Sequence, residues 1–335
     1  MTNVNRGYFY TIFWCLKTGK FTGAFLRGFL PLLGLANQYL DRLKYRAIKF
    51  QNRKNEREFT VVVNNRYKMY LNLYDKGISS DLAIYKTREV FTTDYLQKII
   101  TEDMIIIDIG ANIGYYALME SQLAPKGNVC AIEPVPENYN LLSKNIAVNN
   151  CTNVSTYNFG IGDVNGFSEM YVYDKCNWSS FIKNPWGNII DIIQVPVVTL
   201  DKFIESHVTK NPLFIRMDVE GFEYEVLKGS SKTLQTIRPL IICIEMHPHL
   251  ITKDKVSECI KLMKDNQFSI KAIFVEIGPS DLKFIKIFNK LNNILNLPQY
   301  GYYGNDFNSL EKLLNYGYEP MVFFEKTTTP QQPAF

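Results

Sequence analysis

The chain has 335 residues, of which 46% are hydrophobic, so it can bury a full core in one large domain or two small ones. Its six cysteines show neither paired nor C-x-x-C spacing, which excludes a disulfide framework and a zinc site and predicts a reducing compartment, the cytoplasm. The formal net charge of +4 says little by itself, because the charges are unevenly spread.

The first 54 residues form a basic and apolar leader. They carry ten basic residues and one acidic residue, whereas the rest of the chain has 27 basic and 32 acidic residues. Charges interrupt the apolar runs too often for a spanning helix, and no A-x-A-like cleavage site marks a signal peptide. Two interpretations stay open for this helical arm: contact with an anionic membrane surface, or packing on the rest of the chain or on a dimer partner.

A lead-in with its own secondary structure is expected next. Apolar and polar residues alternate over 59–74, and the Asn-Asn pair at 64–65 predicts a β-hairpin. Residues 79–100 are expected to be helical, with Thr92 or Thr93 as a cap and with Leu96, Ile99 and Ile100 on one face.

Strands and helices then alternate, which predicts an α/β fold with a parallel sheet covered by helices on both faces. The expected strands are 105–109, 129–132, 154–158, 213–217, 240–244, 270–275 and 321–324, with a hairpin formed by 168–173 and 192–198. The predicted division is an arm at 1–54, a lead-in at 55–103, a domain at 104–326 with an insertion at 278–319, and a flexible tail at 327–335.

The most informative stretch follows the first strand of this domain. Gly110 and Gly114 stand in G-x-x-x-G spacing around Asn112, at a turn from strand to helix where backbone amides can approach a ligand. A diphosphate needs the tighter G-x-G-x-x-G turn, and Asp108 would repel it but could hold an ammonium group. Glu133 follows about twenty residues after the glycines, where a ribose-binding carboxylate is expected. The pattern therefore predicts a cofactor with a ribose and an amino-acid tail, although the loop alone also fits other α/β proteins.

Four acidic residues lie at the carboxyl ends of four of the first five predicted strands: Asp108, Glu133, Asp218 and Glu245. A single carboxylate at such a position can be a helix cap. Four in sequence favour a shared ligand site, because ligands of open α/β sheets bind outside the carboxyl ends of the strands.

The runs D-I-G-A-N-I-G-Y from Asp108 and D-V-E-G-F-E from Asp218 resemble the FkbM family, over roughly Tyr67 to His247. This resemblance implies a Rossmann-like class I methyltransferase: a mostly parallel, doubly wound sheet with an antiparallel late strand. It also implies transfer of a methyl group from S-adenosylmethionine to a hydroxyl of a sugar, glycan, glycolipid or small natural product. If the acceptor is a glycan or glycolipid at a membrane, the basic and apolar arm would bring the methyltransferase to that membrane.

The loop and the resemblance together assign residues to the cofactor. Glu133 would hold the ribose, Ile161 and Asp163 would lie near the adenine, and Asp218 would lie beside the sulfonium. The full set is Asp108, Gly110, Ala111, Asn112, Gly114, Tyr115, Glu133, Ile161, Asp163 and Asp218.

A hydroxyl acceptor also needs a base for its proton. The candidates are Asp218, Glu220, Glu245 and His247, and His247 is preferred because imidazole titrates near neutral pH. The other interpretation makes His247 and its neighbour at 249 surface histidines in a turn. Glu223 is assigned only to the first turn of a helix, where a carboxylate is favourable. The oxygen and imidazole ligands of the four candidate bases also suit magnesium or manganese, which is a second interpretation. The spacing matches no dedicated metal motif, so no metal is predicted.

Other classes of function stay open. The missing double glycine disfavours a nicotinamide oxidoreductase. A non-catalytic module could bind the same cofactor, and a methyltransferase could act on protein. A specific nucleic-acid substrate is not expected, because the chain beyond the arm is acidic and shows no basic groove.

Overall fold

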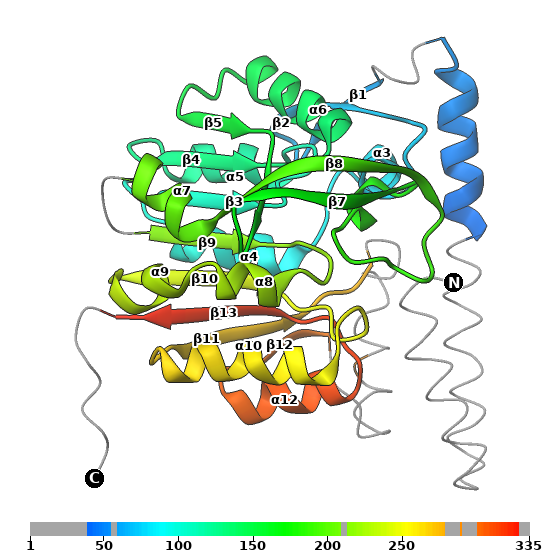
Figure 1. The fold of residues 1–335 in the computed structure, drawn as a ribbon. Helices are drawn as coiled ribbons and strands as arrows, with labels where there is room; N and C mark the ends of the chain where they lie inside the picture. Colours follow the sequence, from blue (N-terminus) through cyan, green and yellow to red (C-terminus); the bar gives the residue numbers. More distant parts are fainter. Residues whose placement is uncertain (1–38, 55–58, 209–212, 279–288, 290–299, 328–335) are drawn as a thin grey trace, which may run out of the picture.

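The computed structural model describes residues 39–54, 59–208, 213–278, 289 and 300–327 (Figure 1). Most of the predicted arm and nearly all of the predicted tail lie outside the described residues. The described part of the arm forms a helix, residues 39–51, at the side of the domain. Within the ranges above, no helix is both long and apolar enough to cross a membrane.

An eight-stranded sheet forms the centre of the domain. Its strands are β3 (Ile105–Ile109), β4 (Asn128–Ile132), β5 (Val154–Tyr157), β9 (Leu213–Met217), β10 (Leu240–Glu245), β11 (Ser269–Val275), β12 (Gly301–Gly304) and β13 (Met321–Lys326). The order across the sheet is β12-β11-β13-β10-β9-β3-β4-β5 (Figure 1). The five strands from β10 to β5 are parallel, whereas β13 is antiparallel to both β10 and β11. The predicted fold class, with its antiparallel late strand, is confirmed.

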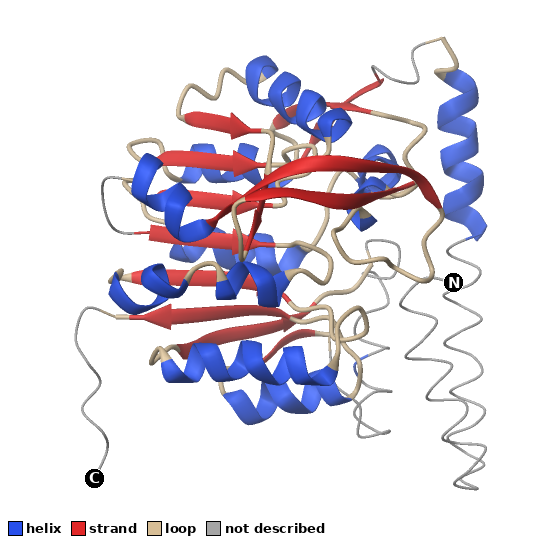
Figure 2. Cartoon of the chain, in the orientation of Figure 1, coloured by secondary structure: helices blue, strands red, loops and turns tan. Residues whose placement is uncertain are grey.

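Helices cover both faces of this sheet (Figure 2). One face carries α3 (Ile78–Tyr85), α4 (Val90–Ile99), α5 (Tyr115–Leu123) and α6 (Pro136–Val148); the other carries α7 (Leu200–His207), α8 (Glu223–Lys228), α9 (Ser231–Thr236), α10 (Lys253–Asp265) and α12 (Phe307–Asn315). Neighbouring residues of β3 point to opposite faces of the sheet. Ile106 packs in the core under α3 to α6, and Ile107 packs in the core under α7 to α12. Such strands are apolar on both faces, which explains the unbroken apolar runs of the sequence.

A smaller sheet crosses in front of the central one (Figure 1). It contains β6 (Gly160–Gly162), β7 (Gly166–Tyr173) and β8 (Ile189–Thr199), in the order β6-β8-β7, with β7 and β8 antiparallel as predicted. A short 3-10 helix, η1 (Cys176–Trp178), lies in the connection between β7 and β8.

The segment predicted to be helical over 79–100 forms two helices, and the threonine cap predicted there is wrong. The structure has α3 and α4 there, separated by a break in which Lys86 and Glu89 adopt left-handed backbone conformations, with φ of 63° and 44°. Glu89, not a threonine, occupies the N-cap position of α4. Thr92 lies inside the helix, where its hydroxyl donates a hydrogen bond to Glu276.

The predicted insertion at 278–319 contributes to the domain itself. β12 extends the edge of the central sheet by pairing with β11, and α12 buries Leu310 and Leu313 in the second core. The helical start predicted for this insertion lies almost entirely outside the described residues.

The lead-in hairpin, β1 (Phe59–Val63) and β2 (Tyr67–Leu71), forms as predicted and is clamped to α6. Asn145 accepts a hydrogen bond from the Tyr70 amide at 2.6 Å and donates to the carbonyls of Tyr70 and Ile113 at 3.2 and 2.8 Å. One turn later, Asn149 makes the same paired contact with the backbone of Lys68, at 3.0 and 2.7 Å. Asn145 is fully buried, whereas the Asn149 contact is exposed.

This difference in burial predicts unequal effects of two matched substitutions. Asn145→Ala should lower the free energy of unfolding by about 2–4 kcal/mol, because it leaves buried backbone groups without partners. Asn149→Ala should lower it by less than about 1 kcal/mol, because water replaces the lost contacts. Denaturant titration of both variants measures the two losses; equal losses would contradict the clamp.

Candidate active site

A pocket opens at the carboxyl ends of β3, β4 and β9 and encloses about 800 Å³, including space open to solvent. Its wall comes from the loop after β3, the end of β4, the start of β6, the η1 segment and the turn after β9. Arg88 and Glu89, at the break between α3 and α4, complete the wall. The position is the one expected for the ligand of an open α/β sheet.

The loop after β3 needs glycine for steric reasons. Gly110 has a φ of +83°, and a Cβ atom there would lie 1.9 Å from the backbone oxygen of Asp218. Gly114 has a φ of +91° and stands at the N-cap of α5. Residues with side chains rarely adopt such backbone conformations. The G-x-x-x-G spacing therefore reflects a tight turn that packs closely against the end of β9.

Glu133 holds this loop in place from the end of β4. Its carboxylate accepts hydrogen bonds from the backbone amides of Asn112 and Val135, both at 2.9 Å. Burial raises the pKa of Glu133 to about 7, although these two hydrogen bonds oppose the rise. The side chain is 4% exposed and lines the pocket.

Arg216, on β9 next to β3, lines the inner end of the pocket, which we call its floor. Its guanidinium lies 3.0 Å from a carboxylate oxygen of Asp108 and 3.1 Å from one of Asp218, and its Cζ is 3.8 Å from the centroid of the Tyr116 ring. Asp108 is fully buried, and burial raises its pKa. The sequence analysis missed Arg216; the signal was a cation in the otherwise apolar strand LFIRM, which must find carboxylate partners.

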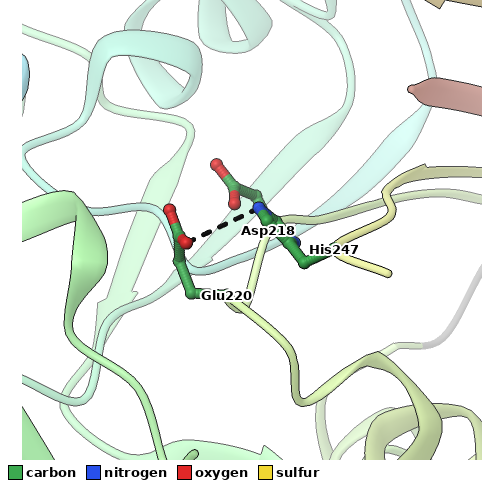
Figure 3. A group of neighbouring side chains, drawn as sticks. All are labelled: Asp218, Glu220 and His247. Atoms are coloured by element: carbon green, nitrogen blue, oxygen red, sulfur yellow. Dashed lines mark ion pairs between the residues drawn. The ribbon is translucent and has the colours of Figure 1, made fainter. Parts of the chain in front are cut away.

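Asp218, Glu220 and His247 converge beside this floor (Figure 3). His247 Nε2 lies 3.6 Å from Glu220 Oε2, and His247 Nδ1 lies 2.7 Å from Glu223 Oε1. Asp218 and Glu220 line the pocket, whereas His247 stands behind them with 3% of its side chain exposed. Asp218 Oδ1 is buried and has no hydrogen-bond partner among the described residues.

Two expectations at this cluster need correction. His247 is buried, so it is not a surface histidine. Burial lowers its pKa, but the carboxylates of Glu220 and Glu223 outweigh burial and raise the pKa well above its ordinary value, so the titration range that favoured it as the base does not apply. Glu223 does more than stabilise a helix start, since it is fully buried and also accepts a hydrogen bond from the Gly221 amide at 3.0 Å.

The structure brings together part of the predicted set and separates the rest. Those that line the pocket are Gly110, Ala111, Asn112, Tyr115, Glu133, Ile161, Asp218 and Glu220. Asp108 is instead paired with Arg216, and Asp163 forms an ion pair with Lys228 at 2.7 Å. Neither Gly114 nor Glu245, the last residue of β10, lines the pocket.

Glu89 is a lining residue that the sequence analysis did not assign to the site. Its carboxylate pairs with Arg88 at 3.0 Å and accepts a hydrogen bond from the hydroxyl of Tyr116. The η1 segment was also missed: the Cys176 amide donates to Asp75 at 2.9 Å, and the Cys176 thiol lies 3.3 Å from the Asn112 side-chain oxygen. These contacts join the lead-in to the glycine loop.

The fold and the position of the pocket are those of a class I methyltransferase. Within that class, the chain belongs to the FkbM family: the family model described as the methyltransferase FkbM domain matches residues 108–319. The resemblance noted in the sequence is therefore confirmed.

Two relatives give the extent of the similarity. Methyltransferase 1 of Beauveria bassiana is 24% identical over 209 residues, which cover 57% of this chain and 82% of that protein. The hexuronic acid methyltransferase AglP of Haloferax volcanii is 29% identical over 178 residues, which cover 50% of this chain and 70% of that protein.

Solved structures are similar at lower identity. TYW2 of M. jannaschii, in complex with AdoMet, gives a TM-score of 0.40 at 15% identity and covers 81% of this chain and 85% of its own. An O-methyltransferase of Bacillus cereus, in complex with SAH, gives a TM-score of 0.39 at 12% identity, covering 70% of this chain and 78% of its own.

The close approach at Gly110 yields a stability prediction. Gly110→Ala should lower the free energy of unfolding by at least about 2 kcal/mol, because the new methyl group meets a backbone oxygen and the backbone is left-handed. Gly317→Ala serves as the control, since Gly317 has a similar φ of +75° but nothing lies within 4 Å of the added Cβ, so only the close approach differs. Thermal and denaturant unfolding measure the loss of unfolding free energy in both variants. Equal losses would contradict the close packing of Gly110 against Asp218.

Proposed function

We propose that the chain transfers a methyl group from S-adenosylmethionine to a hydroxyl of a sugar or of a glycan or glycolipid. The observation that carries this proposal is the pocket itself, in which a glycine loop, a buried ribose-type carboxylate and the carboxylates of Asp218 and Glu220 face one space. The family supports methyl transfer, and the name of the AglP relative supports a sugar acceptor.

In this proposal the donor lies along the ends of β3 and β4. The loop from Gly110 to Asn112 contacts the methionine part, Glu133 accepts hydrogen bonds from the ribose hydroxyls, and Ile161 packs against the adenine. Asp218 stands beside the positively charged sulfonium. Asp108 acts indirectly, because its carboxylate pairs with Arg216 and thereby helps to orient Asp218.

Methyl transfer from a sulfonium is an in-line displacement, so the protein chiefly aligns the acceptor oxygen with the methyl carbon. The carbon–sulfur bond breaks as the carbon–oxygen bond forms, and the hydroxyl proton must leave. Asp218 and Glu220 are the candidate bases that line the pocket, whereas His247 stands behind them. Glu245 lies outside the pocket wall and has no part in this step.

The activity is tested by transfer of labelled methyl groups from S-adenosylmethionine to a panel of free sugars, uronic acids, glycans and glycolipids. Asp218→Asn should reduce the rate at least about 100-fold, because it removes charge beside the sulfonium and a candidate base. Label found on protein lysines but not on any glycan would reject the sugar acceptor, and retention of full activity by the variant would reject the role of Asp218.

The assignment of Glu133 predicts a pH dependence of donor binding. Protonation replaces the charged carboxylate with a much weaker acceptor for the ribose hydroxyls, and the pKa of this carboxyl is about 7. Affinity for S-adenosylhomocysteine should therefore fall about tenfold between pH 8 and pH 6. Glu133→Gln should bind weakly at both pH values. Calorimetry measures both, and an unchanged affinity in the variant would remove Glu133 from the site.

We propose further that residues 39–51 contact an anionic membrane. Leu40, Leu43 and Phe50 recur at helical spacing and are exposed, at 49%, 41% and 72%. The opposite side of the helix is held beside the pocket, since the Tyr45 hydroxyl donates to the carbonyls of Leu73 and Asp75 at 2.8 and 2.7 Å. Exposed apolar side chains among basic ones suit the interface of an anionic bilayer.

A vesicle sedimentation experiment tests this contact. The double variant Leu43→Ser, Phe50→Ser should reduce binding to vesicles rich in phosphatidylserine at least about tenfold, because each side chain loses apolar area buried in the bilayer. Phe167→Ser is the control, as Phe167 is 75% exposed but lies on β7. Equal vesicle binding by the wild type, the double variant and the control would reject membrane contact through residues 39–51. A change in the oligomeric state of the double variant would instead show that this face of the helix contacts a second copy of the chain.

A further inference from the structure

We infer that Asp218, Glu220 and His247 bind a divalent cation, which holds two oxygens of the acceptor. The inference rests on the proposed function for the identity of the acceptor, but not for the cation site. One oxygen or nitrogen atom from each of the three side chains lies within 4.8 Å of the other two (Figure 3). Ligand atoms that share an ion at about 2.1 Å are about 3 to 4 Å apart, so small side-chain rotations complete the geometry.

His247 is oriented as metal-binding histidines are. Its Nδ1 contacts Glu223, which is fully buried, and this contact aims Nε2 between the carboxylates of Asp218 and Glu220 (Figure 3). Nε2 itself makes no hydrogen bond within the described residues, since Glu220 lies 3.6 Å away. A carboxylate behind a histidine is the usual support for a ligand nitrogen.

The carboxylates add a second observation. Arg216 occupies one oxygen of Asp218 at 3.1 Å, and the other oxygen is buried without a hydrogen-bond partner among the described residues. A buried carboxylate oxygen without a partner is unfavourable unless a cation or a donor reaches it. Two carboxylates and one imidazole suit Mn²⁺ or Mg²⁺, with the remaining positions open to water or ligand. The cation takes the place of the proton on Nε2, which is released to solvent on binding.

The same residues point to the class of acceptor. Asp218 and Glu220 face the pocket, so a cation held between them lies where it can also contact oxygens of the acceptor. A cation there binds adjacent oxygens, either two hydroxyls or a hydroxyl and a carboxylate. It would lower the pKa of the bound hydroxyl, whose proton passes to a carboxylate or to solvent as the methyl group is transferred.

Cation binding is tested on the full chain with Mn²⁺ alone, by electron paramagnetic resonance and calorimetry. One Mn²⁺ per chain is expected, with affinity reduced at least about tenfold by His247→Gln and by Asp218→Asn. Glu223→Gln keeps an acceptor for Nδ1 and should reduce affinity less. His249→Gln is the matched control, because His249 lies beyond Pro248 and contacts Glu319 at 2.8 Å. Thermal unfolding checks that each variant folds.

Two outcomes separate this inference from the proposed function. Label transfer that persists in chelator, with no bound Mn²⁺, would overturn the cation site and leave the methyltransferase proposal intact. Mn²⁺ binding that depends on His247, without transfer to any sugar, would support the site and reject the sugar acceptor. Equal Mn²⁺ binding by the wild type and His247→Gln would also overturn the inference.

Discussion

A buried guanidinium organises the pocket. Arg216 is 3% exposed and lies between Asp108 on β3 and Asp218 just after β9. A charge in the interior is tolerated only when it is paired, so these contacts fix the side chain at the boundary of the two central strands. One oxygen of Asp218 therefore pairs with Arg216. The other oxygen has no hydrogen-bond partner among the described residues and belongs to the side chain that meets Glu220 and His247.

The backbone imposes a second constraint at the same place. The Asp218 amide donates to the carbonyl of Ile109 at 3.0 Å, and Gly110 packs directly against the Asp218 backbone oxygen. The loop that would contact the donor and the carboxylate that would meet the sulfonium are therefore held at a fixed separation. Glu133 secures the other side of the loop through the Asn112 amide. Precise placement is the main contribution that a protein makes to an in-line displacement.

Much of the fold could be predicted from the sequence, because its signals are local. Apolar runs followed by a carboxylate marked β4, β9 and β10, the apolar run that contains Asp108 marked β3, and G-x-x-x-G marked the loop, whereas β6 was not predicted. The break between α3 and α4 could not be predicted, because Lys86 and Glu89 are ordinary helix formers that tertiary contacts hold in left-handed conformations. Local signals also gave no reason to suspect that Arg88 and Glu89 line the pocket.

The electrostatic contacts of the site were the least predictable part. Arg216 and Asp108 are 108 residues apart in sequence, and His247 and Glu223 are 24 apart. Spacing along the chain carries no signature of such pairs, so Asp108 was assigned to the ligand and Glu223 to a helix turn. Residue type, together with positions just after predicted strands, made His247 and Glu220 candidates for the chemistry. The parallel pairing of β9 with β10 places the turns that follow these strands, and with them Glu220 and His247, side by side.

Hydrogen exchange with and without S-adenosylhomocysteine tests most directly whether the donor lies at these strand ends. The account predicts slower exchange in the loop 110–114, around Glu133 and in the turn 218–221, with little change in α10 or α12. Protection confined to other elements, or no protection at saturating ligand, would contradict it.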